Sequence, residues 1–91
     1  MEFEAVNGKY VIEDGFIKWF DKKGKLQEVI FIDRINWIWL LGDANKILLL
    51  GNIVQIHMND KELDLYAKEF DQAKQMLDAI LEEKRKLNSN D

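Results

Sequence analysis

The chain contains no cysteine and no threonine, and its single serine, Ser89, lies close to the C-terminus. Without cysteine, neither a disulfide bond nor a thiolate metal site can stabilise the fold. The side chains that usually form nucleophile–base pairs in enzymes are therefore absent or close to a chain end. His57 is the only histidine, whereas zinc sites usually need several His or Cys ligands. We expect a protein that is not an enzyme, with no cofactor and no metal site, and we interpret His57 as a surface or rim residue of a strand.

Two further kinds of ligand site lack their sequence patterns. Neither Asp60-Lys61-Glu62 nor Glu82-Glu83 has the spacing of a calcium-binding loop. The segment Lys22-Lys23-Gly24-Lys25 lacks the spacing of a glycine-rich phosphate loop. None of these segments is therefore predicted to be a calcium or phosphate site.

Basic residues are the minority charge, 13 against 17 acidic ones, and only Arg34 and Arg85 among them are arginines. General nucleic-acid binders obtain most of their affinity by neutralising phosphates, so we expect no nucleic-acid partner. Long hydrophobic runs are also missing, since the longest uncharged stretch, 47–59, has 13 residues and a membrane-spanning helix needs about 20. The N-terminal segment MEFEAVNG shows no secretory signal. A soluble cytoplasmic protein is the expectation.

What the sequence does contain is a series of short β-type runs separated by turn signals such as Asn7-Gly8 and Asp14-Gly15. The intervening loops are too short for crossover helices, so the strands should be antiparallel neighbours. The predicted strands cover residues 9–13, 16–21, 27–33, 36–41, 46–50, 53–58 and 62–67. After them, apolar residues at helical spacing predict an amphipathic helix over 69–87, with Lys84 as the one polar interruption of its apolar stripe, and a frayed tail at 88–91. The 91 residues should form a single domain.

This element order resembles that of the pleckstrin-homology superfold, and the sequence looks like the small bacterial pleckstrin-homology-like (PH-like) domains. The resemblance rests on the segments EVIFIDRINWI, KILLLGNIVQIHM and FDQAKQMLDAIL and runs from about Tyr10 to Leu87. These segments are hydrophobic spacings, not signature residues. The resemblance implies an α+β, mainly β fold: a seven-stranded antiparallel meander curled into a partly open barrel, with a corner at Asp33 and Arg34. The C-terminal helix would plug one mouth of the barrel or lie across a sheet face.

Three central segments, VIFI at 29–32, WIWLL at 37–41 and ILLL at 47–50, are apolar at both odd and even positions. Side chains alternate faces along a strand, so each segment must bury two surfaces. If Ile38 and Leu40 point inward, their neighbours on the same strand point outward. The candidate interface residues are Trp37, Trp39, Leu41, Phe31 and Leu49. The helix, a second chain in a two-fold dimer, or a ligand in an aromatic groove would cover this surface.

A lysine cluster is the other candidate site. In phosphoinositide-binding PH domains a basic motif lines the loop after the first strand, and four lysines fall in a comparable place here. These possible anion-binding residues are Lys18, Lys22, Lys23 and Lys25. The group contains no arginine and is interrupted by Asp21, so a solvated hairpin tip is the competing interpretation.

The sequence therefore favours a non-catalytic protein-interaction or self-assembly module that binds through an outward apolar sheet face. Its partner would be a second copy, in a homodimer, or another protein. The alternative is a small acidic inhibitor or phage-type protein that docks on a basic host protein, steered by its 17 carboxylates. Binding to a membrane surface through the lysine cluster is the least favoured of these interactions.

Overall fold

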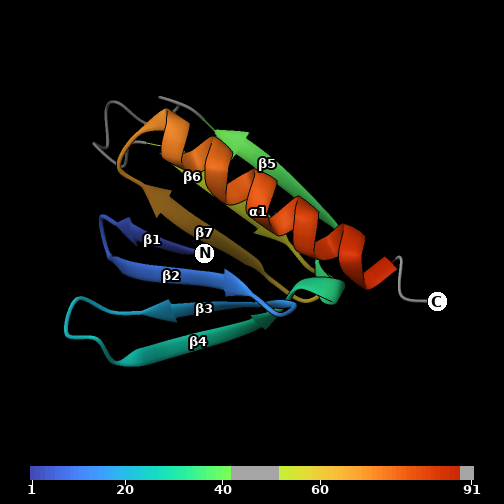
Figure 1. The fold of residues 1–91 in the computed structure, drawn as a ribbon, viewed down its shortest axis with the longest axis horizontal. Coiled ribbons are helices and arrows are strands. Elements are labelled where there is room, and N and C mark those ends of the chain that lie inside the picture. The colour runs from blue at the N-terminus through green and yellow to red at the C-terminus, as the bar shows by residue number, and fades with distance from the viewer. Residues whose placement is uncertain (42–51, 89–91) are drawn as a thin grey trace.

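The computed structural model describes residues 1–41 and 52–88, which form two antiparallel sheets and one long helix (Figure 1). The first sheet contains β1 (Glu2–Ala5), β2 (Gly8–Glu13), β3 (Phe16–Phe20) and β4 (Leu26–Phe31), in that order. The second contains β5 (Trp37–Leu41), β6 (Asn52–His57) and β7 (Glu62–Ala67). A short 3-10 helix, η1 (Ile32–Arg34), follows β4, and α1 (Phe70–Asn88) follows β7.

The prediction of a mainly β chain that ends in one helix is confirmed. Each described strand pairs antiparallel with its neighbour in the chain inside its own sheet. The predicted strand 27–33 ends early, at Phe31, because the chain turns into η1 at the predicted corner of Asp33 and Arg34. Among the described residues, no ladder joins β4 to β5, so the strands form two sheets where one continuous meander was expected.

The strand β1 was not predicted. Its four residues alternate, with Phe3 and Ala5 buried and the two glutamates exposed. Two apolar side chains are a weak signal, and the strand forms because β2 offers an edge on which Phe3 pairs with Tyr10. The strand predicted at 46–50 lies outside the described residues.

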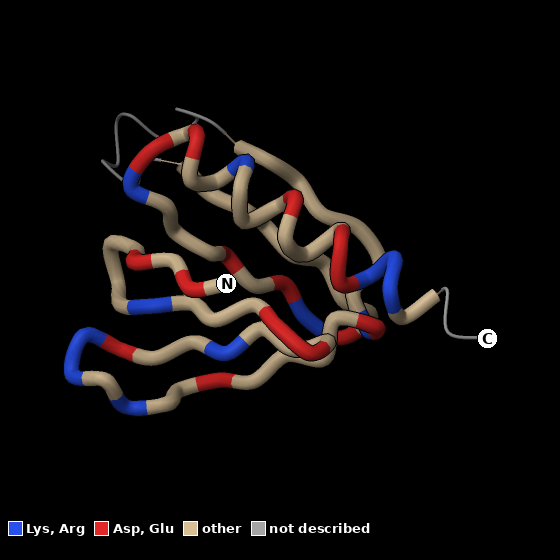
Figure 2. The backbone as a smooth tube through the Cα atoms, in the orientation of Figure 1, with Lys and Arg blue, Asp and Glu red and all other residues tan. Residues whose placement is uncertain are grey.

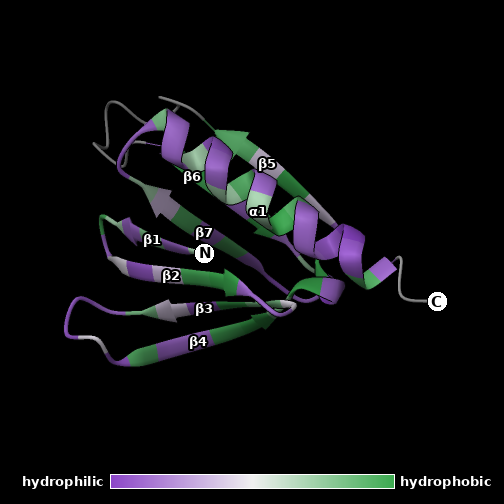
Figure 3. Ribbon diagram, viewed as in Figure 1, coloured by the Kyte–Doolittle hydropathy of each residue, from purple (hydrophilic) through white to green (hydrophobic). Residues whose placement is uncertain are grey.

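The hydrophobic core lies between the two sheets and α1. The helix runs along the second sheet and contacts β5, β6 and β7, and it also contacts β2 and η1 (Figure 1). Hydrophobic residues recur along α1 between hydrophilic ones (Figure 3), and Ala73, Met76, Ala79 and Ile80 are buried. The helix therefore lies across the inner face of the second sheet, one of the two placements that the sequence left open.

Polar contacts fix α1 against the first sheet as well. Near its start, Gln72 Nε2 donates to the backbone oxygen of Glu4 at 2.7 Å. Near its end, Glu83 Oε1 accepts the backbone N–H of Gly15, at the β2–β3 turn, at 2.8 Å. The helix is therefore tied to both ends of the first sheet while its apolar stripe packs on the second.

Candidate functional site

The outer face of the second sheet is set by the register of its three strands. Trp37 pairs with His57, which pairs with Glu62, and Trp39 pairs with Gln55, which pairs with Asp64. Side chains in one such row point to the same face of the sheet. We call this surface the tryptophan face. It consists of Trp37, Trp39, Leu41, Ile53, Gln55, His57, Glu62, Asp64 and Tyr66.

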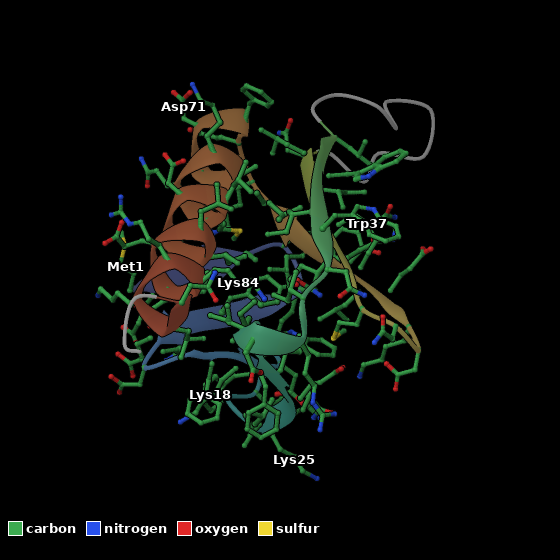
Figure 4. The ribbon with its side chains drawn as sticks, turned by 90° about the vertical axis from the view of Figure 1, so that its right-hand side faces the viewer. Met1, Lys18, Lys25, Trp37, Asp71 and Lys84 are labelled. Carbon is green, nitrogen blue, oxygen red and sulfur yellow. The ribbon has the colours of Figure 1, made fainter. Side chains whose placement is uncertain are left out.

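The two tryptophans of this face are the most prominent exposed side chains of β5. Trp37 is 53% exposed and Trp39 is 54% exposed, whereas Ile38 and Leu40 between and beside them are half-buried and pack against the core. In Figure 4, Trp37 lies on the side of β5 that faces away from α1. The helix thus covers the side of β5 that carries Ile38, and the tryptophan side is open.

His57 lies beneath the tryptophans and is only 8% exposed. Its ring stacks on Trp37 at a centroid distance of 4.7 Å and an interplanar angle of 15°, and Trp39 packs against it at 5.8 Å in a tilted arrangement. The interpretation of His57 as a surface or rim residue is therefore wrong. The residue does lie on the outward side of its strand, but the two indoles cover its ring.

Hydrogen bonds hold the middle row of the face in place. Gln55 Nε2 donates to Asp64 Oδ1 at 3.1 Å, and Gln55 Oε1 lies 2.8 Å from His57 Nε2. Since an amide oxygen only accepts, His57 donates through Nε2. His57 Nδ1 lies 3.5 Å from Glu62 Oε1. The surface that supports the indoles is therefore a connected network and not a set of independently moving side chains.

Charge and hydrogen-bonding groups are distributed unevenly across the face. The β5 side carries the indoles, and neither indole N–H of Trp37 or Trp39 has an acceptor within the part of the chain that the structure describes. The β7 side carries the carboxylates of Glu62 and Asp64, and the Glu62 side chain is 63% exposed. The face thus has exposed donors along one edge and acceptors along the other.

The predicted interface residues are not all brought together. Leu41 shares the tryptophan face, at the end of β5. Phe31 is 48% exposed but belongs to β4 of the other sheet, where its ring packs 5.2 Å from Phe16 and lies 5.6 Å from the guanidinium of Arg34. Leu49 lies outside the described residues. The predicted single apolar surface is therefore divided between two sheets, because the chain turns at η1 between them.

The lysine cluster occupies the β3–β4 hairpin and therefore follows the third strand of the structure, not the first. Lys18 lies on β3, while Lys22, Lys23 and Lys25 lie at the exposed hairpin tip (Figure 2). The Asp21 carboxylate accepts the backbone N–H groups of Lys23 and Lys25, and the second of these bonds is the main cause that lowers the pKa of Asp21. A carboxylate therefore organises the turn, and the cluster is only partly basic.

Hollows also border the second sheet. One, of about 290 Å³, opens beside β7, where Glu62, Asp64 and Tyr66 face Asn7, Tyr10 and Trp19 of the first sheet. Tyr10 donates to Asn7 Oδ1 at 2.9 Å, and Trp19 donates to the backbone oxygen of Asn7 at 3.2 Å. Another, of about 270 Å³, separates β5 from α1 beside Trp37. It is lined by Ile35, Asn36, Trp37, Ile38, Leu77, Ile80, Leu81 and Lys84.

The first hollow is lined by carboxylates and aromatic side chains, and the second mainly by apolar ones. In residues 1–41 and 52–88, no three His, Cys, Asp or Glu side chains gather in a way that would hold a metal ion. No buried side-chain nitrogen or oxygen in the same ranges lacks a hydrogen-bond partner. None of the helical structure described is long and apolar enough to cross a membrane. The tryptophan face is therefore the strongest candidate site.

No model of a known protein family, no curated protein and no solved structure matches this chain. Its class is consequently defined by architecture: two antiparallel sheets followed by one C-terminal helix.

Proposed function

We propose that this chain is a non-catalytic interaction module that binds a protein through the tryptophan face. The observation that carries the proposal is the pair Trp37 and Trp39, both more than half exposed on one strand and both resting on His57. Tryptophan, with tyrosine and arginine, is enriched among the hot spots of protein interfaces. Adjacent large aromatic side chains in water are characteristic of such contacts.

The free energy available from this pair is substantial. A tryptophan buries up to about 250 Å² when it is fully enclosed. Removing the exposed half of one indole from water would contribute about 3 kcal/mol at about 25 cal/mol per Å². Because His57 already fixes the ring of Trp37 by stacking, less side-chain entropy is lost on binding than for a free indole.

We also assign the fold to the PH-like class. Support comes from the element order, a four-stranded antiparallel sheet, then a three-stranded one, then a C-terminal helix that contacts both. In this proposal the two sheets form the halves of a partly open barrel. A fold does not define a function, so the binding proposal depends on the tryptophan face alone.

A capture experiment with matched variants tests the binding proposal. Tagged wild type, Trp37→Glu and Trp39→Glu are each produced alongside an untagged copy in host cells. Phe31→Glu is the control, because Phe31 is exposed to a similar extent, 48%, but lies on the other sheet. We expect a bound protein, whether the untagged copy or another chain, that both tryptophan variants lose and the control retains. Binding that all four baits share, or no binding by the wild type, would contradict the proposal.

A second candidate partner is a basic protein. Glu62 and Asp64 border the same face as the indoles, and lysine or arginine side chains can pair with carboxylates and lie over aromatic rings. Docking of this acidic chain on a basic protein would weaken steeply with added salt. Binding that resists salt and needs Trp39 but not Asp64 would argue against this candidate.

A further inference from the structure

We infer that the occupant of the tryptophan face is a second copy of this chain, bound in a two-fold dimer whose axis runs parallel to β6. The inference rests on the proposed function and specifies the partner for the same face. It follows from the order of donors and acceptors across the three strands, with β5 and β7 on either side of β6. A two-fold interface must be self-complementary, so the face has to match its own rotated image.

The strand register supplies that match. A two-fold axis parallel to the strands keeps each residue at its height along the sheet and exchanges the outer strands. β5 of one copy therefore lies over β7 of the other. Since Trp39 and Asp64 share one row, Trp39 meets Asp64 of the partner subunit. In the next row, Trp37 meets Glu62 of the partner subunit.

The groups that meet are chemically complementary. The indole N–H of Trp39 is a donor without an acceptor among the described residues, and carboxylates accept such bonds strongly. A tryptophan N–H that becomes buried needs a partner, or the contact loses the free energy of desolvating it. By symmetry each pairing occurs twice. The second copy thus provides acceptors at the heights where the first copy presents donors.

The competing arrangement lacks this complementarity. A two-fold axis that also lies between the facing sheets, but runs perpendicular to the strands, places β5 over β5 and β7 over β7. The indole N–H donors then face one another, and the carboxylates of Glu62 and Asp64 face like charges, which disfavours the contact. The register therefore distinguishes the two ways of stacking the face on itself.

The middle of the face fits the same arrangement. Gln55 and His57 on β6 lie at the axis and already satisfy each other by hydrogen bonding inside one copy. In the end row, Leu41 pairs with Ile53, but Ile53 is only 3% exposed within one copy, so the dimer contact depends on the rows of Trp37 and Trp39. No polar group at the centre has to give up a partner when the face is covered.

The size of the face sets the strength of the dimer. Each strand places three side chains on it, of which Ile53 and His57 are already buried within one copy, so the face is smaller than the roughly 20–30 residues per side of a standard interface. Facing sheets pack about 10 Å apart, a distance that the large indoles fill. We expect a dissociation constant on the order of 10–100 μM, weaker than that of standard-sized interfaces.

Sedimentation equilibrium from micromolar to about 1 mM protein, a range that spans weak association, tests the inference by charge exchange. Trp39→Glu places a carboxylate opposite Asp64 of the partner subunit, and Asp64→Lys replaces the acceptor opposite the indole N–H with a second donor. We expect Trp39→Glu to be monomeric and Asp64→Lys to dimerise more weakly than the wild type. The double variant Trp39→Glu/Asp64→Lys should dimerise again, because the two new charges then face each other across the interface. Phe31→Glu, on the other sheet, should dimerise like the wild type.

A milder substitution separates loss of dimerisation from loss of folding, and circular dichroism checks that every variant is folded. Trp39→Phe keeps an aromatic ring and removes the N–H donor, so it should weaken dimerisation at least about tenfold, since the bond is lost twice. A wild type that stays monomeric to about 1 mM overturns the second copy as occupant, while capture of another protein would leave the proposed function standing. If Asp64→Lys dimerises as strongly as the wild type, or if the double variant does not dimerise, the β5-over-β7 arrangement is wrong.

Discussion

Lys84 on α1 donates through Nζ to the backbone carbonyl oxygen of Asp33 in η1, at 2.9 Å. The same ammonium lies 3.4 Å from the backbone oxygen of Ile32. The Ile32 oxygen also accepts the backbone N–H of Ile35 at 3.1 Å, whereas a carbonyl at the end of so short a helix, such as that of Asp33, lacks a partner within the helix. The one polar residue that interrupts the apolar stripe of α1 therefore ties the helix to the corner between the two sheets.

Replacing Lys84 by alanine should lower the free energy of unfolding by about 1 kcal/mol, because partly exposed hydrogen bonds to an ammonium are lost. In a domain of this size that corresponds to a decrease in Tm of about 4–8 °C. Lys74→Ala is the matched control, since Lys74 is an exposed lysine of the same helix. Thermal unfolding followed by circular dichroism measures both, and equal effects would show that the Lys84 contacts do not stabilise the corner.

Glu83 should make part of the stability depend on acid pH. The backbone N–H of Gly15 holds the pKa of the Glu83 carboxyl below its ordinary value of 4.5. A depressed pKa means that the contribution is present above that ordinary value and is lost as the pH falls below it. Urea unfolding should find wild type more stable than Glu83→Gln at neutral pH, with the difference shrinking as the solution is acidified. A difference that stays constant with pH would contradict this.

The Tyr10 hydroxyl joins the two sheets, and its removal should be costly. It accepts the backbone N–H of Tyr66 at 3.3 Å and donates to Asn7 Oδ1 at 2.9 Å. We expect Tyr10→Phe to destabilise the fold by about 1–2 kcal/mol, because these partly buried partners lose their bonds. Tyr66→Phe should cost less, since no described residue bonds to that hydroxyl. Denaturant unfolding of the two variants compares them directly.

Alkaline unfolding gives a second measure of Tyr10. Burial raises the pKa of the Tyr10 phenol above its ordinary value of 10.0. The neutral phenol is thus favoured in the folded state, so its contribution is present below that value and is lost as the pH rises above it. Wild type should lose stability in this range more steeply than Tyr10→Phe. Parallel curves for the two proteins would show that another group causes the alkaline loss.

Gly8 and Gly24 should differ sharply in their tolerance of alanine. Both have a positive φ, +137° and +84°, but a Cβ on Gly8 would lie 2.0 Å from the backbone oxygen of Phe20, whereas one on Gly24 would meet nothing within 4 Å. Gly24→Ala should cost about 1–2 kcal/mol from backbone strain. Gly8→Ala should cost more, because the β2 and β3 backbones must move apart. Similar midpoints in urea for the two variants would contradict this.

Stability measurements should also separate the tryptophan face from the core. Met76 is fully buried, and Met76→Ala should cost about 2–5 kcal/mol through the cavity it leaves. Trp39 is 54% exposed, so Trp39→Ala should lower the free energy of unfolding by less than Met76→Ala does in a monomeric sample. A large loss for Trp39→Ala would show that the indole supports the fold and does not serve mainly for binding.

Local patterns account for the elements that were predicted well. The strand β7, Glu62–Ala67, matches the predicted range because its polar and apolar residues alternate, and α1 matches within one residue at each end because its apolar residues recur at helical spacing. By contrast, β1 was missed, and His57 was misjudged. Both depend on partners distant in the sequence: the edge of β2 in the first case and the indoles of β5 in the second.

In the candidate site, too, local patterns were predictable and contacts between distant segments were not. Residues 37–41 are apolar at every position, so the sequence indicated that β5 has two faces to cover but could not assign which neighbour covers each. The corner at η1 then separated Phe31 from the tryptophans, because it ends one sheet and starts the other. Only the arrangement of sheets and helix determines which predicted residues share a surface.

The amino-acid order alone determined the β-rich architecture, the C-terminal helix and the excess of apolar surface on the central strands. These follow from side-chain periodicity and turn residues, which act over a few neighbouring positions. The tertiary structure decided that α1 packs on the Ile38 side of β5 and leaves Trp37 and Trp39 facing outward over His57. It did so because a surface becomes covered or exposed only when segments far apart in the chain pack together.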